Sequence, residues 1–419
     1  MGSNFFSTTI GEQITLQRGF DITKKEQQEG NVPVVSSGGI SSFHNVSKVE
    51  APGVVLGRKG TLGTVFFVEK DFWPHDTSLW VKDFKGNNPQ FVYYFFKGMS
   101  AELKKMDVGA ANPALNRNHV HPLQVEWPRR EVQDQIVSVG AALDQKITLN
   151  NQINQTLEQM AQTLFKSWFV DFDPVKAKMN DEQPEWMDAP FLSKEVASLF
   201  PEKLVESELG LIPEGWNVES IKDFGDVICG KTPSKKNADF YGGHVPFIKI
   251  PDTHGKVFIT ETSDTLTQAG DESQPKKRIP ENSICVSCIA TVGQVFVTTK
   301  PSHTNQQINS VVPNDANALY YLLFKFKGLN KHFHDLASGG SATLNMNTST
   351  FSKVVLVRPT ADVLKAFHKT VGGLMDKMLV NQLENATLSK LRDTLLPKLL
   401  SGEIDLENVQ VEQAKALAE

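Results

Sequence analysis

The sequence presents the same order of features twice, at a nearly constant offset. The segment 57–66 is echoed by 287–296, and the helical pattern that begins at Asn154 returns at Asn385. The offset is more than half the length of the chain, whereas solenoid repeats have periods of roughly 20–50 residues. The repeat therefore predicts a duplicated module with two equivalent contact surfaces.

Composition places the chain among globular proteins of two or three domains. It has 419 residues, of which 40% are hydrophobic and 22% are charged. No apolar run reaches the roughly 18–20 residues that a membrane helix needs, and we expect no signal peptide. Three cysteines, Cys229, Cys285 and Cys288, are too few for a disulfide framework, so we expect a cytoplasmic location.

The net charge of −5 is distributed unevenly along the chain. Residues 1–130 and residues 217–359 each carry 15 Lys and Arg against 12 Asp and Glu, a net charge of +3 for each segment. Residues 131–216 carry −9 and residues 360–419 carry −2. A mild positive excess in both copies, with the acidic residues segregated elsewhere, favours two surfaces that face phosphates.

The modules themselves read as mixed helix and strand. Short β-rich runs broken by Gly, Pro and Asn recur in both, and a helix is expected late in each, at 90–106 and 316–336. We therefore predict an α/β (α+β) fold with two similar domains, residues 1–130 and residues 217–359. Each contains a string that begins with Gly and ends in Leu-Asn before its last strand, at 109–116 in the first copy and at 339–345 in the second.

Two long helices are expected outside the modules, at 131–169 and 360–402. Apolar residues follow a spacing of three and four over about five heptads in the first, and the second repeats the pattern. Each helix would be on the order of 50 Å long. Since neither apolar stripe can remain exposed, the prediction is an antiparallel pair within the chain.

Other features of these connecting segments leave alternatives open. Asn150 and Asn381, which are related by the same offset as Asn154 and Asn385, interrupt the two stripes. Either they lie in the seam and fix its register, or they point to water. Residues 170–216 are rich in Pro, Asp and Glu and are interpreted as an acidic linker, and residues 403–419 as a tail.

One sequence pattern suggests nucleotide binding. Residues 225–232 satisfy the phosphate-loop pattern GxxxxGK[ST], which works only between a strand and a helix. Pro233 follows directly, no apolar helical stripe comes after it, and the first copy lacks the pattern. A lysine- and serine-rich loop that faces DNA phosphates is the favoured interpretation.

Catalytic and metal sites find little support in the sequence. Cys285 and Cys288 have the spacing of a metal knuckle but lie in an alternating β run without further ligands. His75 and Asp76 lack a nucleophile-elbow signature, so a catalytic triad is set aside. We expect no catalytic residue, no metal and no cofactor bound by this chain.

The polar residues in equivalent loops are the candidates for DNA contacts. Arg, Asn and Gln can pair with base edges, whereas Lys and Ser hold phosphates. Each one alone could equally be a solvated surface residue. In the first copy the candidates are Arg18, Lys24, Lys25, Ser36, Ser37, Arg58, Lys59, Asn112, Asn116, Arg117 and His119. In the second copy they are Lys231, Thr232, Ser234, Lys235, Lys236, Lys249, Asn305, Gln306, Gln307, Asn345 and Asn347.

Several strings resemble the specificity (S) subunits of type I restriction–modification systems, over nearly the whole chain. The string from Leu164 to Val175 is similar to the central region of that family, and Leu395 to Ile404 to its C-terminal signature. The strings 128–136, 213–216 and 230–237 also fit. The second copy lacks the Glu-x-Gln element found at 131–133, so the resemblance leaves open whether both helices contact partners equally.

The resemblance implies a non-catalytic subunit of a methyltransferase and endonuclease complex. Two target-recognition domains would each bind one half of a bipartite, asymmetric site in double-stranded DNA, and the paired helices would set the spacer. Two methyltransferase (M) subunits would dock on the helices, and motor–nuclease (R) subunits would join them. The alternatives are a nucleotide-dependent enzyme using residues 225–232, or a helical scaffold that reads no DNA.

Overall fold

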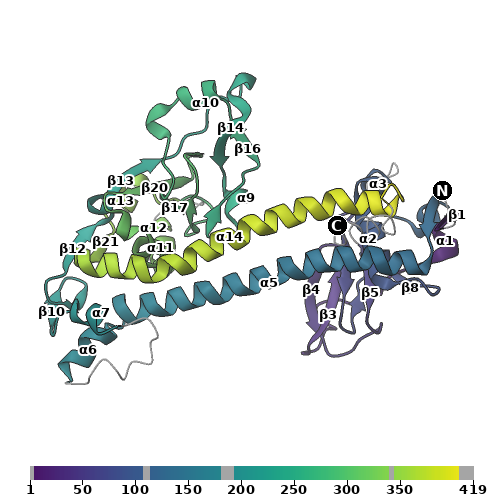
Figure 1. The fold of residues 1–419 in the computed structure, drawn as a ribbon, viewed down its shortest axis with the longest axis horizontal. Coiled ribbons are helices and arrows are strands. Elements are labelled where there is room, and N and C mark those ends of the chain that lie inside the picture. Colours follow the sequence, from purple (N-terminus) through teal and green to yellow (C-terminus); the bar gives the residue numbers. More distant parts are fainter. Residues whose placement is uncertain (1–3, 107–113, 181–192, 339–343, 405–419) are drawn as a thin grey trace, which may run out of the picture. The chain divides into compact units, whose positions relative to one another are not determined.

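The computed structural model of the chain describes residues 4–106, 114–180, 193–338 and 344–404. The chain divides into two compact units (Figure 1): unit 1 comprises residues 1–149 and 384–419, and unit 2 comprises residues 150–383. Both dividing points fall inside a long helix. Among the described residues, no helix is long and apolar enough to cross a membrane.

Unit 1 opens with a mixed domain. Its elements are β1 Phe5–Thr9, α1 Ile10–Gln13, β2 Thr15–Arg18, β3 Val32–Ser36, β4 Gly39–His44, β5 Gly53–Gly57, β6 Val65–Val68, β7 Trp73–Pro74, β8 Ser78–Asp83, α2 Pro89–Gly98, α3 Ser100–Lys105, α4 Arg117–Val120 and β9 Gln124–Pro128. One sheet has the antiparallel order β2-β8-β5-β6, and another has the order β4-β3-β7, in which β3 and β7 are parallel. β1 pairs with β9, just before helix α5 Arg130–Phe169.

Unit 2 contains the corresponding domain. Its main elements are β12 Asn217–Ser220, α8 Ile221–Phe224, β13 Gly225–Cys229, β14 Tyr241–Ile248, α9 Ile250–Thr253, β15 Phe258–Ile259, β16 Asp264–Leu266, α10 Gln268–Glu272, β17 Ile284–Ser287, β18 Val295–Thr298, β19 His303–Thr304, β20 Ile308–Pro313, α11 Leu319–Gly328, α12 Asn330–Ala337, α13 Thr348–Ser352 and β21 Val355–Arg358. Helix α14 Ala361–Leu400 follows. Single 3-10 turns lie at Ala238–Phe240, Pro275–Lys277 and Ala316–Ala318.

The two domains share one topology, which confirms the predicted duplication. The order β13-β20-β17-β18 repeats β2-β8-β5-β6, the order β16-β14-β19 repeats β4-β3-β7, and β12 pairs with β21 as β1 pairs with β9. In both three-stranded sheets the last pair is parallel. Unit 2 adds β15, which pairs in parallel with β18. The α/β (α+β) class predicted from the sequence is therefore correct.

Short polar side chains start equivalent helices in both domains. Thr9 caps α1 in a capping box with Glu12, and Ser220 caps α8 in a box with Asp223. Each box satisfies two backbone donors that would otherwise lack partners at the start of the helix. The same local chemistry therefore turns the chain from its first strand into the sheet in both domains.

The long helices pack against each other within each unit, and the contacts run in opposite chain directions. In unit 1, Asp144 accepts a hydrogen bond from Arg392, and Lys146 lies 3.5 Å from Glu384. In unit 2, the backbone carbonyl of Met378 accepts from Asn154, and the ring of Phe367 contacts Phe165, Trp168 and Phe169. The antiparallel pairing predicted from the apolar stripes is thus observed in each unit.

The structure decides between the two interpretations of the asparagines. Asn150 is 1% exposed and Asn381 is fully buried. Asn381 donates a hydrogen bond of 2.9 Å to the side chain of Asn154 across the helix pair. Both amides are therefore buried rather than directed to water, and Asn381 has a polar partner on the facing helix.

The sequence-based element boundaries need three amendments. The helix expected at 90–106 is broken at Met99, and the one at 316–336 at Leu329, each at a residue with φ near −90° and ψ near 0°. The segment 170–216, interpreted as a linker, contains α6 Asp173–Met179, α7 Lys194–Ser198, β10 Leu204–Ser207 and β11 Gly210–Pro213. Its apolar residues enter the core of unit 2, where Trp216 contacts Phe169 and Phe200.

Candidate nucleic-acid interface

A tight loop follows the shortest strand of the three-stranded sheet in each unit. It comprises residues 75–77 after β7 in unit 1 and residues 305–307 after β19 in unit 2. The same backbone hydrogen bonds fix both loops. In unit 1 the Gly19 N–H donates to Ser78 O, the Arg58 N–H to Thr77 O, and the His75 N–H to Val35 O. In unit 2 the corresponding bonds run from Gly230 N–H to Ile308 O, from Cys288 N–H to Gln307 O, and from Asn305 N–H to Ile248 O. The two units therefore present equivalent loops on equivalent scaffolds.

In unit 1, arginines converge on this loop. Arg18, at the end of β2, donates a hydrogen bond of 2.6 Å to the carboxylate of Asp76. Arg58, directly after β5, donates to the backbone carbonyl of Asp76 over 3.2 Å. A cavity of about 430 Å³ beside them is also lined by Asn116 and Arg117. The fold thus brings together four candidate residues from three separate segments.

The charges of this cluster are coupled. Partial burial opposes ionisation of Asp76, but the hydrogen bond from Arg18 and the nearby positive charges together outweigh it and hold the pKa of that carboxyl below its ordinary value. Burial, helped by the nearby charge of Arg18, lowers the pKa of Arg58. Guanidinium groups stay protonated at neutral pH despite such shifts. Arg18 and Asp76 therefore form an ion pair.

Most of the unit 1 candidates are exposed or half-buried. Asn116 caps α4 by accepting a hydrogen bond from the Asn118 amide, which engages its side-chain oxygen. Three exposed lysines lie on loops. Lys59 forms a β-bridge with Ala114, and Lys24 and Lys25 lie between β2 and β3. Half-buried or exposed positions are also taken by Ser36, Ser37, Arg117 and His119. Asn112 falls outside the described residues.

In unit 2 the equivalent loop carries amides. Thr232 donates a hydrogen bond of 2.7 Å to the side-chain oxygen of Gln306, which is exposed. Asn305 is 8% exposed, and its amide both donates to the Gln307 side chain and accepts from the Gln307 backbone. Asn305 therefore holds the loop through internal hydrogen bonds, and Gln306 is the amide that is exposed to solvent.

Lysines flank this loop. The carbonyl of Lys231 accepts a hydrogen bond from buried Gln274, which anchors the basic segment to the domain. Lys235 borders a cavity of about 410 Å³. The side chains of Ser234 and Lys236 are exposed, whereas the ammonium group of Lys249 is paired with Asp264 at 2.7 Å.

The last two candidates of unit 2 lie where Ala114 and Asn116 lie in unit 1. Asn345 is exposed and forms a β-bridge with Ile289. Asn347 caps α13 by accepting from the Thr350 amide. The segments that precede these residues, 109–113 and 339–343, lie outside the described residues.

The phosphate-loop pattern does not have the structure that its chemistry needs. Residues 225–229 form strand β13, and the residues after Lys231 form no helix before the single 3-10 turn Ala238–Phe240. Phosphate loops place the anion at a helix N-terminus. Gly230 has another role: a Cβ there would lie 2.2 Å from the carbonyl oxygen of Asn305. The small residue lets β13 approach the loop at 305–307.

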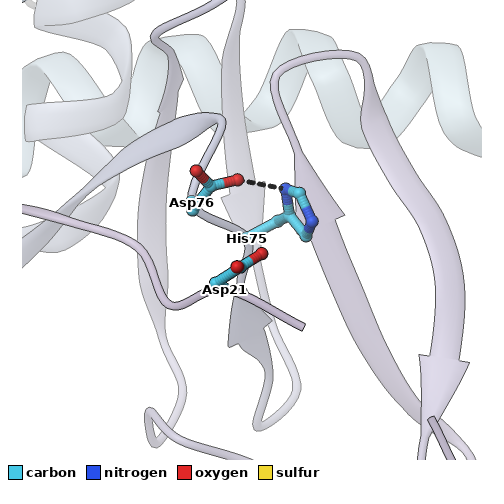
Figure 2. A group of neighbouring side chains, drawn as sticks. All are labelled: Asp21, His75 and Asp76. Carbon is cyan, nitrogen blue, oxygen red and sulfur yellow. Dashed lines mark ion pairs between the residues drawn. The ribbon is translucent and has the colours of Figure 1, made fainter. Parts of the chain in front are cut away.

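Sequence reasoning set aside two residues that the structure places in the loop at 75–77 of unit 1. His75 and Asp76 belong to the loop itself, and together with Asp21 they bring one ligand-type atom each within 4.8 Å of one another (Figure 2). The Asp76 carboxylate already pairs with Arg18, whose charge opposes a cation. The sequence did contain a signal for these residues: the offset between the two copies relates residues 75–77 to the candidate residues 305–307.

Comparison with known families matches residues 5–159 and 213–362 to the type I restriction modification DNA specificity domain. The chain belongs to this family. The specificity subunit of the type I restriction enzyme HindI from Haemophilus influenzae is 47% identical over 327 residues, covering 70% of this chain and 71% of that protein. The protein is thus a type I specificity subunit with two recognition domains, one in each matched region.

Two further relatives agree with this assignment. The MjaIX specificity subunit of Methanocaldococcus jannaschii is 28% identical over 332 residues, covering 76% of this chain and 70% of that protein. The solved S subunit from M. genitalium shares 14% identity, with a TM-score of 0.57 over 94% of this chain and 96% of that chain. This structural likeness concerns the fold alone.

Proposed function

We propose that each recognition domain of this specificity subunit binds one half of a bipartite DNA target. The observation that carries the proposal is the pair of equivalent loops, 75–77 and 305–307, on equivalent sheets with different side chains around them. A duplicated scaffold explains why both domains dock on DNA in the same way. Different side chains on it explain an asymmetric target.

The residues divide by chemistry into two proposed roles. The exposed loop cations are assigned to the phosphate backbone, since such contacts position a protein without reading sequence; these are Lys24, Lys25, Lys59, Lys231, Lys235 and Lys236. The groups around the two loops are assigned to base edges; these are Arg18, Arg58, Arg117, Gln306 and Gln307. Asn305 and Lys249 are already bonded internally, so their proposed role is to support the surface.

The long helices provide the proposed spacer and the proposed docking site. Each contributes one part to unit 1 and the other part to unit 2. At about 1.5 Å per residue, their length would set the gap between the two half-sites. Methyltransferase subunits would dock on them and motor–nuclease subunits would join. The chain itself would supply no chemistry, and adenine methylation would come from the partners in the cytoplasm.

An exchange of one domain tests the proposal. Residues 217–359 are replaced by the second domain of another family member, and the chimera is expressed with a methyltransferase subunit. Sequencing of the methylated positions in cellular DNA should show one half of the motif changed and the other half retained. A change in both halves would contradict independent reading by the two domains.

Matched insertions test the helical spacer separately. One helical turn is added to α5 and one to α14 at facing positions, so that the pair stays in register. The motif should keep both half-sites and gain a longer gap, because two major-groove readers must keep a set spacing along the helix of DNA. An unchanged gap would argue against the helices as the spacer.

A further inference from the structure

The two loops, 75–77 and 305–307, are alike in backbone and different in charge. Their equivalent hydrogen bonds define which side chains occupy the same place. The strand pairing agrees, since Arg18 faces Leu79 and Cys229 faces Asn309 in the same register. At equivalent positions, Arg18 of unit 1 corresponds to Cys229 of unit 2, Arg58 to Cys288, and Asp76 to Gln306.

In unit 1, Asp76 of the loop holds Arg18, which lies at the end of β2. The Arg18 side chain is 55% exposed, whereas the Asp76 side chain is 19% exposed. The carboxylate is therefore the anchored partner, and part of the guanidinium fork remains accessible from outside. Fixing the fork lowers the entropy lost when it makes two parallel hydrogen bonds to another planar group.

The local charge argues against a phosphate as the partner of Arg18. Asp76 is ionised beside it, and Asp21 lies near Asp76 and His75, exposed to solvent. The Asp76 carboxylate, bonded to Arg18, offsets the charge of that guanidinium and so weakens its attraction to a phosphate, while a carboxylate does not oppose the neutral edge of a base. The exposed lysines Lys24 and Lys25 keep their assignment to the phosphate backbone.

In unit 2 the same place holds only neutral groups. Gln306 faces outward with its oxygen bonded to Thr232. Burial raises the pKa of the Cys288 thiol to about 12, so the residue in the place of Arg58 is uncharged at neutral pH. A side-chain amide offers one donor and one acceptor side by side, which matches the Hoogsteen edge of adenine.

We propose that the two domains read different bases from the same structural position. In unit 1, Arg18 pairs with the two acceptors of a guanine, and Asp76 is the residue that positions it. In unit 2, Gln306 pairs with an adenine and Thr232 positions it. The inference rests on the proposed function, and it adds the residues and the base class for one position in each half-site.

The experiment compares the methylated motif in DNA of cells that express the full chain with a methyltransferase subunit. Arg18→Lys keeps the charge and loses the two-pronged geometry, so one guanine position in a single half-site should become degenerate. The loss of discrimination should be about 5- to 150-fold, the range for one bidentate pair. Gln306→Ala should relax one adenine position in the other half-site only. The matched control is Arg129→Lys, an exposed arginine between β9 and α5, which should leave the motif intact.

The positioning role of Asp76 has its own readout. Asp76→Ala should relax the same guanine position as Arg18→Lys, and Asp76→Asn should relax it less, because an amide oxygen still accepts from Arg18. In the Arg18→Lys background, Asp76→Ala should cause no additional loss of base choice, since its effect passes through the arginine. A merely structural role would lower the melting temperature and the overall methylation without changing the preference at one position.

Failure of this inference can be told apart from failure of the proposed function. If the unmodified chain directs no methylated motif, the proposed function is wrong. If it directs a bipartite motif that Arg18→Lys and Gln306→Ala leave unchanged, the function stands and the assignment of these two readers is wrong. Relaxation of both half-sites by either substitution would also overturn the assignment.

Discussion

Arg392 on α14 donates a hydrogen bond of 2.6 Å to Asp144 on α5, and Tyr94 of α2 donates to the other oxygen of the same carboxylate over 2.8 Å. All three belong to unit 1. Burial, reinforced by the hydrogen bond to Asp144, raises the pKa of Tyr94, so the phenol remains a donor across the physiological range. One carboxylate thus joins the recognition domain to both long helices.

Removing this junction should destabilise unit 1. We expect Arg392→Ala to lower its free energy of unfolding by about 2 kcal/mol, because a charged hydrogen bond is lost in a partly buried site. Hydrogen exchange of α2 and of the end of α14 measures the local effect. Lys146→Ala, which breaks an exposed pair with Glu384 on the same helices, should cost less than about 1 kcal/mol. Equal losses for both variants would contradict the special role of Arg392.

The stability of unit 1 should depend on the titration of His121. Its ring accepts a hydrogen bond of 3.0 Å from the Leu16 amide, and burial, together with the charge of Arg117, lowers its pKa. The unfolded chain therefore binds a proton more readily than the folded chain. The free energy of unfolding should fall as the pH drops below about 6.5, the ordinary pKa of histidine. Once the pH is below the pKa of His121 in the folded chain, this residue should cause no further loss.

Denaturant unfolding between about pH 5 and 8, a window that spans the ordinary pKa of histidine, measures this dependence. His121→Gln should flatten the slope in that range, since the titrating group is gone. His119→Gln, at an exposed position on the adjoining helix α4, should retain the slope of the unmodified chain. An unchanged slope in His121→Gln would assign the pH dependence to other groups.

Gly230 should be required for packing rather than for nucleotide binding. A methyl group there would meet the backbone oxygens of Asn305 and Thr304 at 2.2 and 2.4 Å, so Gly230→Ala should destabilise unit 2 by about 1–3 kcal/mol. Gly373→Ala in α14, where a Cβ meets nothing within 4 Å, should instead stabilise by about 0.5–1 kcal/mol. Protection of the unmodified chain by Mg²⁺ and ATP in a thermal melt would revive the phosphate-loop interpretation.

Lys235 and Lys236 should bind phosphate and not bases. Each substitution to Ala should weaken binding to target and non-target duplexes alike, and should reduce the slope of log affinity against log salt by about 0.9. Fluorescence anisotropy at several salt concentrations measures the slope. Lys203→Ala, an exposed lysine before β10, serves as the control and should leave the slope unchanged. A change in motif on substitution of Lys235 would show base reading instead.

The repeated order of features was enough to predict the duplicated α/β domains and the paired helices. Period and spacing are local properties: apolar residues at every third or fourth position can be buried only on a partner helix, and the second copy supplies that partner within the chain. The same offset related Asn150 to Asn381, although the sequence left open whether they were buried. The structure buries both, and Asn154 accepts the hydrogen bond of Asn381 from the facing helix.

Gln133 shows a further limit of sequence reasoning. Its place in a family motif, and its absence from the second copy, suggested a contact with partner subunits. In the structure Gln133 is 2% exposed, donates to Asn87 and accepts from the Asn88 amide, so it anchors α5 to its own domain. The equivalent Leu364 anchors α14 by apolar packing. Pattern alone does not distinguish an internal anchor from a binding residue.

The sequence by itself determined the family, the duplication, the helices and the set of polar loop residues, because these follow from composition and from contacts that repeat along the chain. Only the tertiary structure decided which of those residues meet. Arg18, Asp76 and Arg117 are far apart in the chain and come together through strand order. The charge of the first loop and the neutrality of the second arise from that assembly, since a side chain's partner depends on distance in space.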